Sequence, residues 1–333
     1  MKLSLKKRPP DAVVDSASEP AKLRRPKSRH NEVTAGERWA ARAYLAPSLI
    51  GVLLFFILPF GRIVLYAVTD NPVNLEFVGL DNFINVIGNR AFQDAAWNTF
   101  MFSVIAVPLA VVLALMLAMV LEAKIPGKSR FRTFFLSPMM VPVASVVLIW
   151  QVIFHYNGAL NALLAESSIF QQLWEFFSAD PYRAVDWIKT DQAIGRVVIV
   201  LLFLWKNLGY NMILFMSALG NIPKEQLEAA AVDGASPFRR FWVIKFRYLS
   251  PSILFVTILS LINSFKVFRE VYLLTGNYGV GPFYLLQHFM NNTFRNMDYQ
   301  KLSSAAILMA AVVVIIIGAM FLIEDRFGKD VEQ

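Results

Sequence analysis

Polar and charged side chains interrupt two long apolar stretches of the chain. They are Lys206, Asn207 and Asn211 in the stretch 193–219, and Ser260, Asn263, Ser264 and Lys266 in the stretch 251–275. Within a membrane, groups of this kind mark solute pathways, but they also hydrogen-bond one helix to the next. The residues leave both interpretations open. Because a lysine at the bilayer centre costs about 2.5–3.5 kcal/mol, we expect neither lysine to face lipid.

Catalytic and nucleotide-binding arrangements are absent from the sequence. Gly-Lys-Ser at 127–129 ends like a phosphate-binding loop, but Glu122 stands where its first glycine is required. The three histidines are too far apart to have metal-ligand spacing, and the chain has no cysteine. The histidines are His30, His155 and His288. We therefore expect no cofactor in this chain, so any energy must come from a partner or an ion gradient.

The polar residues must be positioned by membrane-spanning helices. Apolar residues make up 56% of the 333 residues and charged residues only 17%, against roughly 25% in soluble domains. The apolar residues form six blocks of about 20 residues, the length needed to cross a bilayer. These blocks predict an all-α membrane protein with a single six-helix domain, residues 43–324. The predicted spans are Tyr44–Val68, Thr99–Leu121, Phe134–Phe154 (broken at Pro138 and Pro142), Ala193–Leu219, Pro251–Thr275 and Ser303–Ile323.

Basic residues predict the orientation of these spans. Eleven lysines and arginines precede the first span. The loops after the second and fourth spans and the C-terminal tail lie on the same side of the membrane, and this side carries 22 lysines and arginines in all. Because basic residues favour the cytoplasmic side, both termini are predicted to be cytoplasmic. Residues 1–42 are predicted to be a disordered basic tail and 325–333 a short tail. The net charge of +8 then reflects topology, and no nucleic-acid partner is expected.

The loop 221–250 is predicted to form a helix, a break and a second helix. Pro223 suits a first helical position, and Glu228 is one of two acidic residues in the early turns. Gly234 can adopt the left-handed conformation that ends a helix, and Ser236-Pro237 can begin the next. The three alanines at 229–231 make a thin helix that can dock in a partner's groove. An ordinary amphipathic loop is the alternative.

This loop resembles the EAA loop of ABC-importer permease subunits. That motif has Glu-Ala-Ala, three residues, Gly, nine residues and Ile, and the chain matches it with Glu228, Ala229, Ala230, Gly234 and Ile244. The resemblance implies the ABC type I importer permease fold and a coupling helix seated on a separate ATPase. The implied coupling residues are Glu228, Ala229, Ala230, Asp233 and Gly234. Phe246 and Arg247 replace the family's usual Leu and Pro, so we expect a less kinked second segment.

The resemblance narrows to permeases for carbohydrates. The matching segments are 77–83, 97–99, 127–133, 157–161 and 205–210, whereas 274–282 and 300–302 depart from the group's pattern. The sugar-lining positions of that group carry over to Met139, Val143, Trp205, Gly209, Ser260, Asn263 and Ser264. Lys206 and Lys266 lie beside them, and we include both in the predicted pathway.

The implied function is the permease subunit of an ATP-driven, binding-protein-dependent importer of sugars or oligosaccharides in the bacterial inner membrane, working by alternating access. The implied partners are a second homologous permease subunit, two ATP-binding subunits that hold ATP and magnesium, and an extracellular or periplasmic binding protein. The amphipathic segment Ile169–Phe177 either helps to dock that protein or is a plain interfacial helix.

The alternative is a secondary carrier or a receptor without an ATPase. A carrier should place carboxylates inside its spans for ion coupling. Glu270, near the outer end of the fifth span, is the only acidic residue in the first five predicted spans, which disfavours a carrier.

Lys206 and Lys266 suggest a further hypothesis about the substrate. We expect no carboxylate in their own spans to lie deep enough to neutralise both. An acidic sugar such as a uronate oligosaccharide would then complete the charge. Alternatively, each lysine faces water, backbone carbonyls or a carboxylate of the second subunit.

Overall fold

The computed structural model describes residues 35–122, 126–177, 184–188, 192–276, 279 and 281–328. It consists of two units, Met1–Ile57 and Leu58–Gln333. Within the described residues the regular structure is helical, apart from one isolated bridge between Thr69 and Phe77. The predicted all-α class is therefore confirmed.

The first unit contains α1 (Ala35–Val52) and the π-helix η1 (Leu53–Ile57). The elements of the second unit are α2 (Leu58–Ala67), α3 (Asp81–Ile87), α4 (Arg90–Glu122), α5 (Lys128–Met140), α6 (Val143–Phe154), α7 (Ala159–Glu166), α8 (Ser168–Phe177), α9 (Gln192–Gly220), α10 (Lys224–Val232), α11 (Pro237–Arg240), the π-helix η2 (Phe241–Lys245), α12 (Phe246–Lys266), α13 (Phe268–Thr275), the 3-10 helix η3 (Gly281–Phe283), α14 (Leu286–Arg295) and α15 (Tyr299–Gly328).

Six stretches are long and apolar enough to span a membrane, as predicted. They are Arg42–Ala67, Arg90–Glu122, Val143–Glu166, Ala193–Gly220, Pro237–Thr275 and Tyr299–Asp325. Several helices extend beyond the predicted spans because polar residues continue a helix into water, where hydropathy no longer detects it. The predicted extent of the disordered N-terminal tail differs for this reason. Residues 35–42, predicted to be disordered, are helical, and α15 continues to Gly328; residues 1–34 and 329–333 lie outside the described part.

Of the two breaks predicted in the third span, the one at Pro142 is confirmed. It falls at Val141–Pro142, between α5 and α6, where Val141 is extended because a proline follows it. Pro138 lies inside α5 and does not break the helix, and the third apolar stretch begins after the break, at Val143. The break in the fifth span was not predicted. It falls at Val267, where α12 ends and α13 begins.

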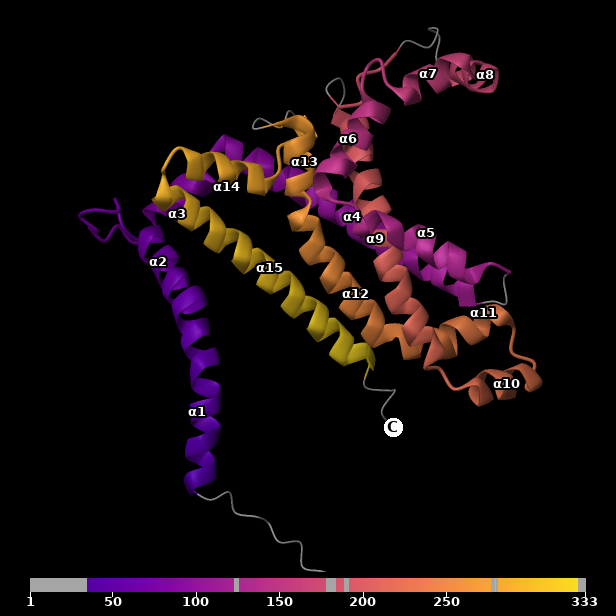
Figure 1. Cartoon of the computed structure of the whole chain (residues 1–333), viewed down its shortest axis with the longest axis horizontal. Coiled ribbons are helices and arrows are strands. Elements are labelled where there is room, and N and C mark those ends of the chain that lie inside the picture. The colour runs from indigo at the N-terminus through magenta and orange to yellow at the C-terminus, as the bar shows by residue number, and fades with distance from the viewer. Residues whose placement is uncertain are drawn as a thin grey trace, which may run out of the picture. The chain divides into compact units, whose positions relative to one another are not determined.

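A seam of small residues lies on α4, the longest helix in the described part of the chain. Ala106, Ala110, Ala114 and Ala118 recur every fourth residue on α4, and all four are fully buried. This spacing places them on one face, where small side chains let helix backbones approach closely. α4 packs against α9 in the centre of the second unit (Figure 1).

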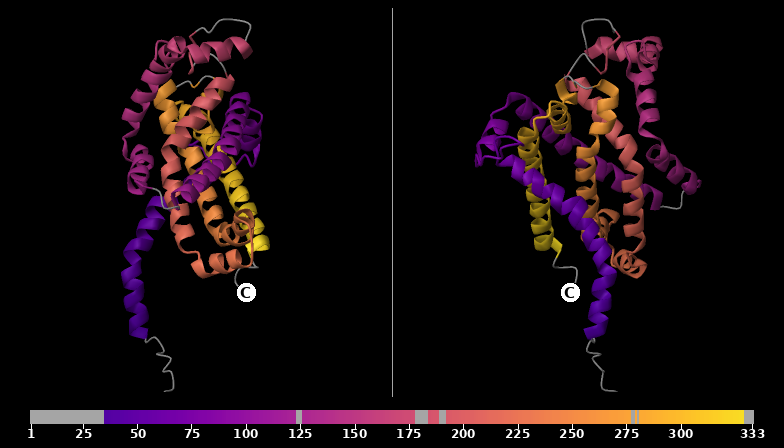
Figure 2. Two further views of the ribbon diagram at one scale, coloured as in Figure 1. Left: turned by 90° about the vertical axis from the view of Figure 1, so that its right-hand side faces the viewer. Right: turned by 60° about the vertical axis from the view of Figure 1, so that its left-hand side comes forward.

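Short helices gather at both ends of the second unit. Helices α3, α7, α8, α13 and α14 lie at one end, and α10 and α11 lie at the other (Figure 1; Figure 2). The sequence predicted the helix at 169–177 and the loop helix at α10. It missed α3 and α14, which are too short to register as spans.

A buried histidine stabilises the start of α14. His288 Nδ1 accepts a hydrogen bond of 3.3 Å from the backbone N–H of Leu285, and the imidazole packs edge-on against Phe268 at 4.6 Å. Tyr272 and Tyr284 also lie against its ring. Burial lowers the pKa of His288 from 6.5 to about 4, because a buried imidazolium loses its hydration.

This burial predicts acid sensitivity of the α14 end. Unfolding exposes His288, which then binds a proton more readily than it does in the folded protein. The contribution of His288 to the free energy of unfolding is therefore full above pH 6.5 and is lost as the pH falls towards 4. At about 1.4 kcal/mol per pKa unit, the contribution is about 3 kcal/mol. The thermal midpoint of the purified protein should therefore fall between pH 6.5 and 4. His288→Gln keeps an acceptor for Leu285 without titrating, and it should flatten this dependence; an equally steep decline in that variant would contradict the assignment.

Candidate functional site

The loop between α9 and α12 contains α10, a helix whose two ends are well defined. Pro223 is the residue before the helix, one position earlier than predicted. At the other end, Ala235 N–H donates to Ala230 O at 2.9 Å and Gly234 N–H donates to Ala231 O at 3.1 Å. These two bonds form a Schellman motif, which requires the left-handed backbone of Gly234 (φ +79°). The predicted helix end is confirmed.

The predicted coupling residues lie on an open surface. Glu228, Ala229, Asp233 and Gly234 are exposed and Ala230 is half-buried. Leu227 packs against the core, while Val232 remains 88% exposed. The helix therefore presents small and acidic residues on a face that the described part of this chain leaves uncovered.

The second helix of the loop begins as predicted. Ser236 Oγ accepts a hydrogen bond from Arg239 N–H at 3.2 Å, and Pro237 follows at the first helical position. The helix then passes through the π-turn of η2 and continues as α12. Lys245 in this turn pairs with Glu122 at the end of α4 at 2.7 Å.

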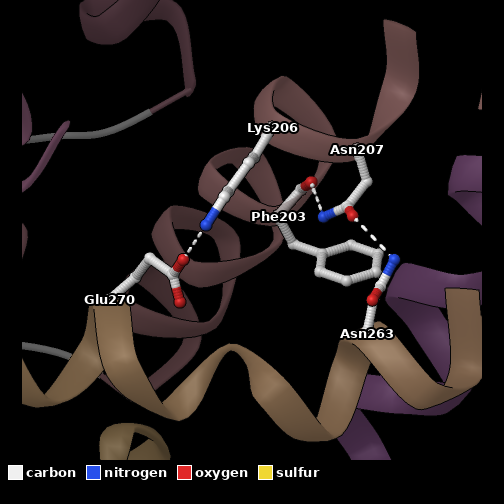
Figure 3. A network of polar contacts seen from close by, with 5 residues as sticks. All are labelled: Phe203, Lys206, Asn207, Asn263 and Glu270. Carbon is white, nitrogen blue, oxygen red and sulfur yellow. Dashed lines mark hydrogen bonds and ion pairs between the residues drawn. The ribbon is translucent and has the colours of Figure 1, made fainter. Parts of the chain in front are cut away.

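A polar cavity of about 310 Å³ lies between α9, α12 and α13. Figure 3 shows four of its polar side chains, Lys206 and Asn207 from α9, Asn263 from α12 and Glu270 from α13. The complete lining is Leu202, Phe203, Lys206, Asn207, Asn263, Lys266, Val267, Arg269 and Glu270. The cavity therefore combines two amides, three cations and one carboxylate.

Glu270 forms an ion pair with Lys206 (Figure 3). The sequence predicted no carboxylate in these spans deep enough to neutralise both Lys206 and Lys266, and Glu270 does reach one of them, Lys206. The break at Val267 starts a new helix, which carries Glu270 to the level of Lys206 and buries its side chain to 4% exposure. The two residues are 64 positions apart, so no local pattern predicts the pair.

Two amides form a second link across the cavity. Asn263 Nδ2 donates to Asn207 Oδ1 at 3.2 Å, and Asn207 Nδ2 donates to the backbone oxygen of Phe203 at 2.9 Å (Figure 3). Asn263 therefore lies in the cavity, although an amide on α9 already binds it.

Three other predicted pathway residues pack between helices instead. Ser260 accepts a hydrogen bond from Asn211 at 2.9 Å, and Ser264 bonds Ser103 at 2.9 Å. Both serines are buried, which corrects the expectation that they line a pathway beside Asn263 in this conformation. Gly209 is buried against the backbone of α5, since a Cβ there would lie 1.9 Å from Phe135 O.

The remaining predicted residues lie outside the cavity lining. Met139 is exposed on α5 and Val143 is half-buried at the start of α6. Trp205 is about one-third exposed, and its indole packs edge-on against Trp150 at 6.0 Å. Of the predicted pathway residues, the cavity thus brings together Lys206, Asn263 and Lys266.

Comparison with known proteins identifies the family. Residues 106–333 match the family described as the binding-protein-dependent transport system inner membrane component. The chain belongs to this family.

Its relatives in this family are permeases. The chain is 29% identical over 234 residues to the sn-glycerol-3-phosphate transport system permease protein UgpA of Escherichia coli O6:K15:H31, covering 68% of this chain and 74% of UgpA. It is 30% identical over 285 residues to the lactose transport system permease protein LacF of Rhizobium radiobacter, covering 84% and 91%. The fold is similar to that of a chain in the bacterial alginate ABC transporter, which was solved in complex with an alginate-pentasaccharide-bound periplasmic protein. The TM-score is 0.73 at 19% sequence identity, and the similarity covers 88% of this chain and 96% of that one. The predicted ABC importer permease fold is confirmed.

The exposed α10 loop and the polar cavity both belong to the part of the chain that matches the binding-protein-dependent transport family. The matched region contains both the α10 loop and every residue that lines the cavity. Sequence reasoning missed Arg269 altogether and did not place Asn207 or Glu270 in the site. Arg269 follows Lys266 by three residues, so an unbroken helix would place both on one face, and this spacing was a usable signal in the sequence.

Proposed function

We propose that this chain is the permease subunit of a bacterial importer that carries a carbohydrate across the inner membrane by alternating access. The relatives' named solutes, lactose and sn-glycerol-3-phosphate, are polyhydroxylated, and the amides of Asn207 and Asn263 suit hydroxyl groups. The proposal rests on one observation, the position of α10. This exposed helix lies in the loop that connects α9 to α12, and both of these helices line the cavity.

The coupling follows from that connection. A separate ATPase subunit would hold α10 in a cleft, with Glu228 and Ala229 at the contact and Gly234 fixing the exit of the chain. Movement of the ATPase would displace the adjoining ends of α9 and α12. The cavity between these helices would then change shape, and the links from Lys206 to Glu270 and from Asn207 to Asn263 would rearrange.

The remaining parts of the machine are assigned by the same proposal. Two ATP-binding subunits hold ATP and magnesium, and a second homologous permease subunit completes the pathway. The α10 end and both termini face the cytoplasm. A periplasmic or extracellular binding protein docks at the opposite end, where α8 offers an amphipathic surface.

Gly234 provides the test of this function. A Cβ at Gly234 meets no atom within 4 Å, so only its left-handed backbone opposes substitution. That backbone costs a non-glycine residue about 1–2 kcal/mol, most for a β-branched one. Gly234→Val should therefore yield an assembled transporter whose ATP hydrolysis no longer responds to the binding protein and whose uptake falls about tenfold or more.

Gly234→Asn is the matched control, because asparagine tolerates the left-handed conformation. It should remain coupled. Normal coupling in Gly234→Val would show that α10 is not the coupling helix, and solute uptake without the ATPase subunits would favour a secondary carrier.

A further inference from the structure

We propose that the cavity between α9, α12 and α13 binds an anionic group on its carbohydrate, a carboxylate or a phosphate, and that Glu270 holds Lys206 in place until that group arrives. This inference rests on the proposed function, because it names the chemical class of the solute that the importer carries. It differs from the sequence-based hypothesis in giving Lys206 an internal partner.

The charges in the cavity do not balance. Lys206, Lys266 and Arg269 face a single carboxylate, Glu270. Among the described residues, the ion pairs are Lys206–Glu270 and Lys245–Glu122. Lys266 and Arg269 therefore have no carboxylate partner in the described part of the chain, and the cavity carries a net charge that a neutral sugar would leave uncompensated.

The carboxylate of Glu270 is itself incompletely bonded. One oxygen contacts Lys206, while Oε2 is buried and has no hydrogen-bond partner within the described structure. A buried carboxylate oxygen without a donor is unfavourable. The Lys206–Glu270 pair is thus a contact that another anion can replace, rather than a fully satisfied structural lock.

The break at Val267 arranges the donors around an anion. Lys266 ends α12, whereas Arg269 and Glu270 belong to the first turn of α13. An anionic group in the cavity can therefore be held by Lys206 from α9 and by cations from both sides of the break. Arginine can bind a carboxylate or a phosphate through two parallel hydrogen bonds. The neighbouring Asn207 and Asn263 would exchange the bond between them for bonds to sugar hydroxyls.

The absence of cysteine from the chain permits a direct measurement of this charge. In the complete detergent-solubilised transporter, Asn263→Cys would be modified with an anionic sulfonatoethyl methanethiosulfonate and with its cationic trimethylammonium counterpart. Because a charged cleft raises the local concentration of its counter-ion, the anionic-to-cationic rate ratio should exceed that of a free thiol by about tenfold. Lys266→Gln and Arg269→Gln should each lower the ratio, and Glu270→Gln should raise it.

Two variants control for other effects. Lys301→Gln removes a cation from a different cavity and should leave the ratio unchanged. The double variant Lys206→Gln/Glu270→Gln removes a pair of opposite charges and should also preserve it, even if Glu270→Gln alone folds poorly. A ratio equal to that of a free thiol, or one that does not respond to Lys266→Gln and Arg269→Gln, overturns the proposal; carboxylates of the second subunit would produce this result.

Protection of the thiol introduced by Asn263→Cys identifies the anion. If the cavity binds a carboxylate, trigalacturonate should slow the modification more than its uncharged methyl ester does. If it binds a phosphate, sn-glycerol 3-phosphate should slow the modification more than glycerol does. Equal protection within both pairs overturns the proposal. These measurements need neither ATP nor the binding protein, so their failure leaves the proposed coupling function intact, and a coupling failure does not alter them.

Discussion

Replacing Gly209 with alanine is expected to remove most of the folded protein. The added Cβ would lie 1.9 Å from the backbone oxygen of Phe135 and 2.5 Å from its carbonyl carbon. Both atoms belong to the backbone of α5, so no side-chain rotation can relieve the overlap. Overpacking of a core costs about 1–3 kcal/mol where side chains can adjust, and here the cost should reach or exceed the upper value. The readouts are the yield in membranes and the thermal midpoint.

Gly220→Ala is the matched control for this substitution. Gly220 lies on the same helix, α9, and a Cβ there meets nothing within 4 Å. Alanine should be neutral or slightly stabilising at that position, since it favours helix more than glycine does. If Gly209→Ala were as stable as Gly220→Ala, then α5 would not pack closely on α9.

Replacing Asn161 with leucine should release residues 184–188, which Asn161 ties to α7. The Asn161 side-chain amide donates to Tyr156 O at 2.7 Å and to Val185 O at 2.8 Å, and its oxygen accepts from Trp187 Nε1 at 2.9 Å. Leucine would fill similar space but remove these partly buried hydrogen bonds, each of which contributes about 0.5–1.5 kcal/mol. Limited proteolysis of the purified transporter should therefore cut this region at least about ten times faster.

Asn157→Leu supplies the comparison, because Asn157 is an exposed residue in the turn just before α7. It should keep the wild-type cleavage pattern. Equal protection of the Asn161→Leu and wild-type proteins would mean that residues 184–188 are held by other contacts. Loss of stimulation by the binding protein in Asn161→Leu alone would connect this segment to docking.

The sequence carried enough information to predict the membrane helices and the α10 loop. Apolar blocks of bilayer length are a local signal, and no packing detail is needed to read them. The ends of α10 and the start of α11 are also set locally, by Gly234 and by Ser236-Pro237. The family resemblance rested on the same loop, through the spacing of Glu228, Gly234 and Ile244, and the match over 106–333 confirms it.

The candidate site was harder to predict because its contacts are non-local. Ser260, Asn263 and Ser264 lie within one helical turn, yet only Asn263 lines the cavity. The other two are buried by Asn211 on α9 and Ser103 on α4. Helical spacing indicates which side chains share a face, but the neighbouring helix decides whether that face meets a cavity or a packed seam.

The buried alanine seam of α4 has a mechanical consequence. Ala106, Ala110, Ala114 and Ala118 let α4 approach α9 closely, and α9, which contains no proline, resists bending, whereas α4 contains Pro108. The breaks at Val141–Pro142 and at Val267 are the compliant points of the same unit. Elastic deformation during a transport cycle would therefore concentrate at these breaks. The cavity is lined by stiff α9 on one side and by α12 and α13, with the break between them, on the other. Its shape would therefore change mainly through movement of α12 and α13.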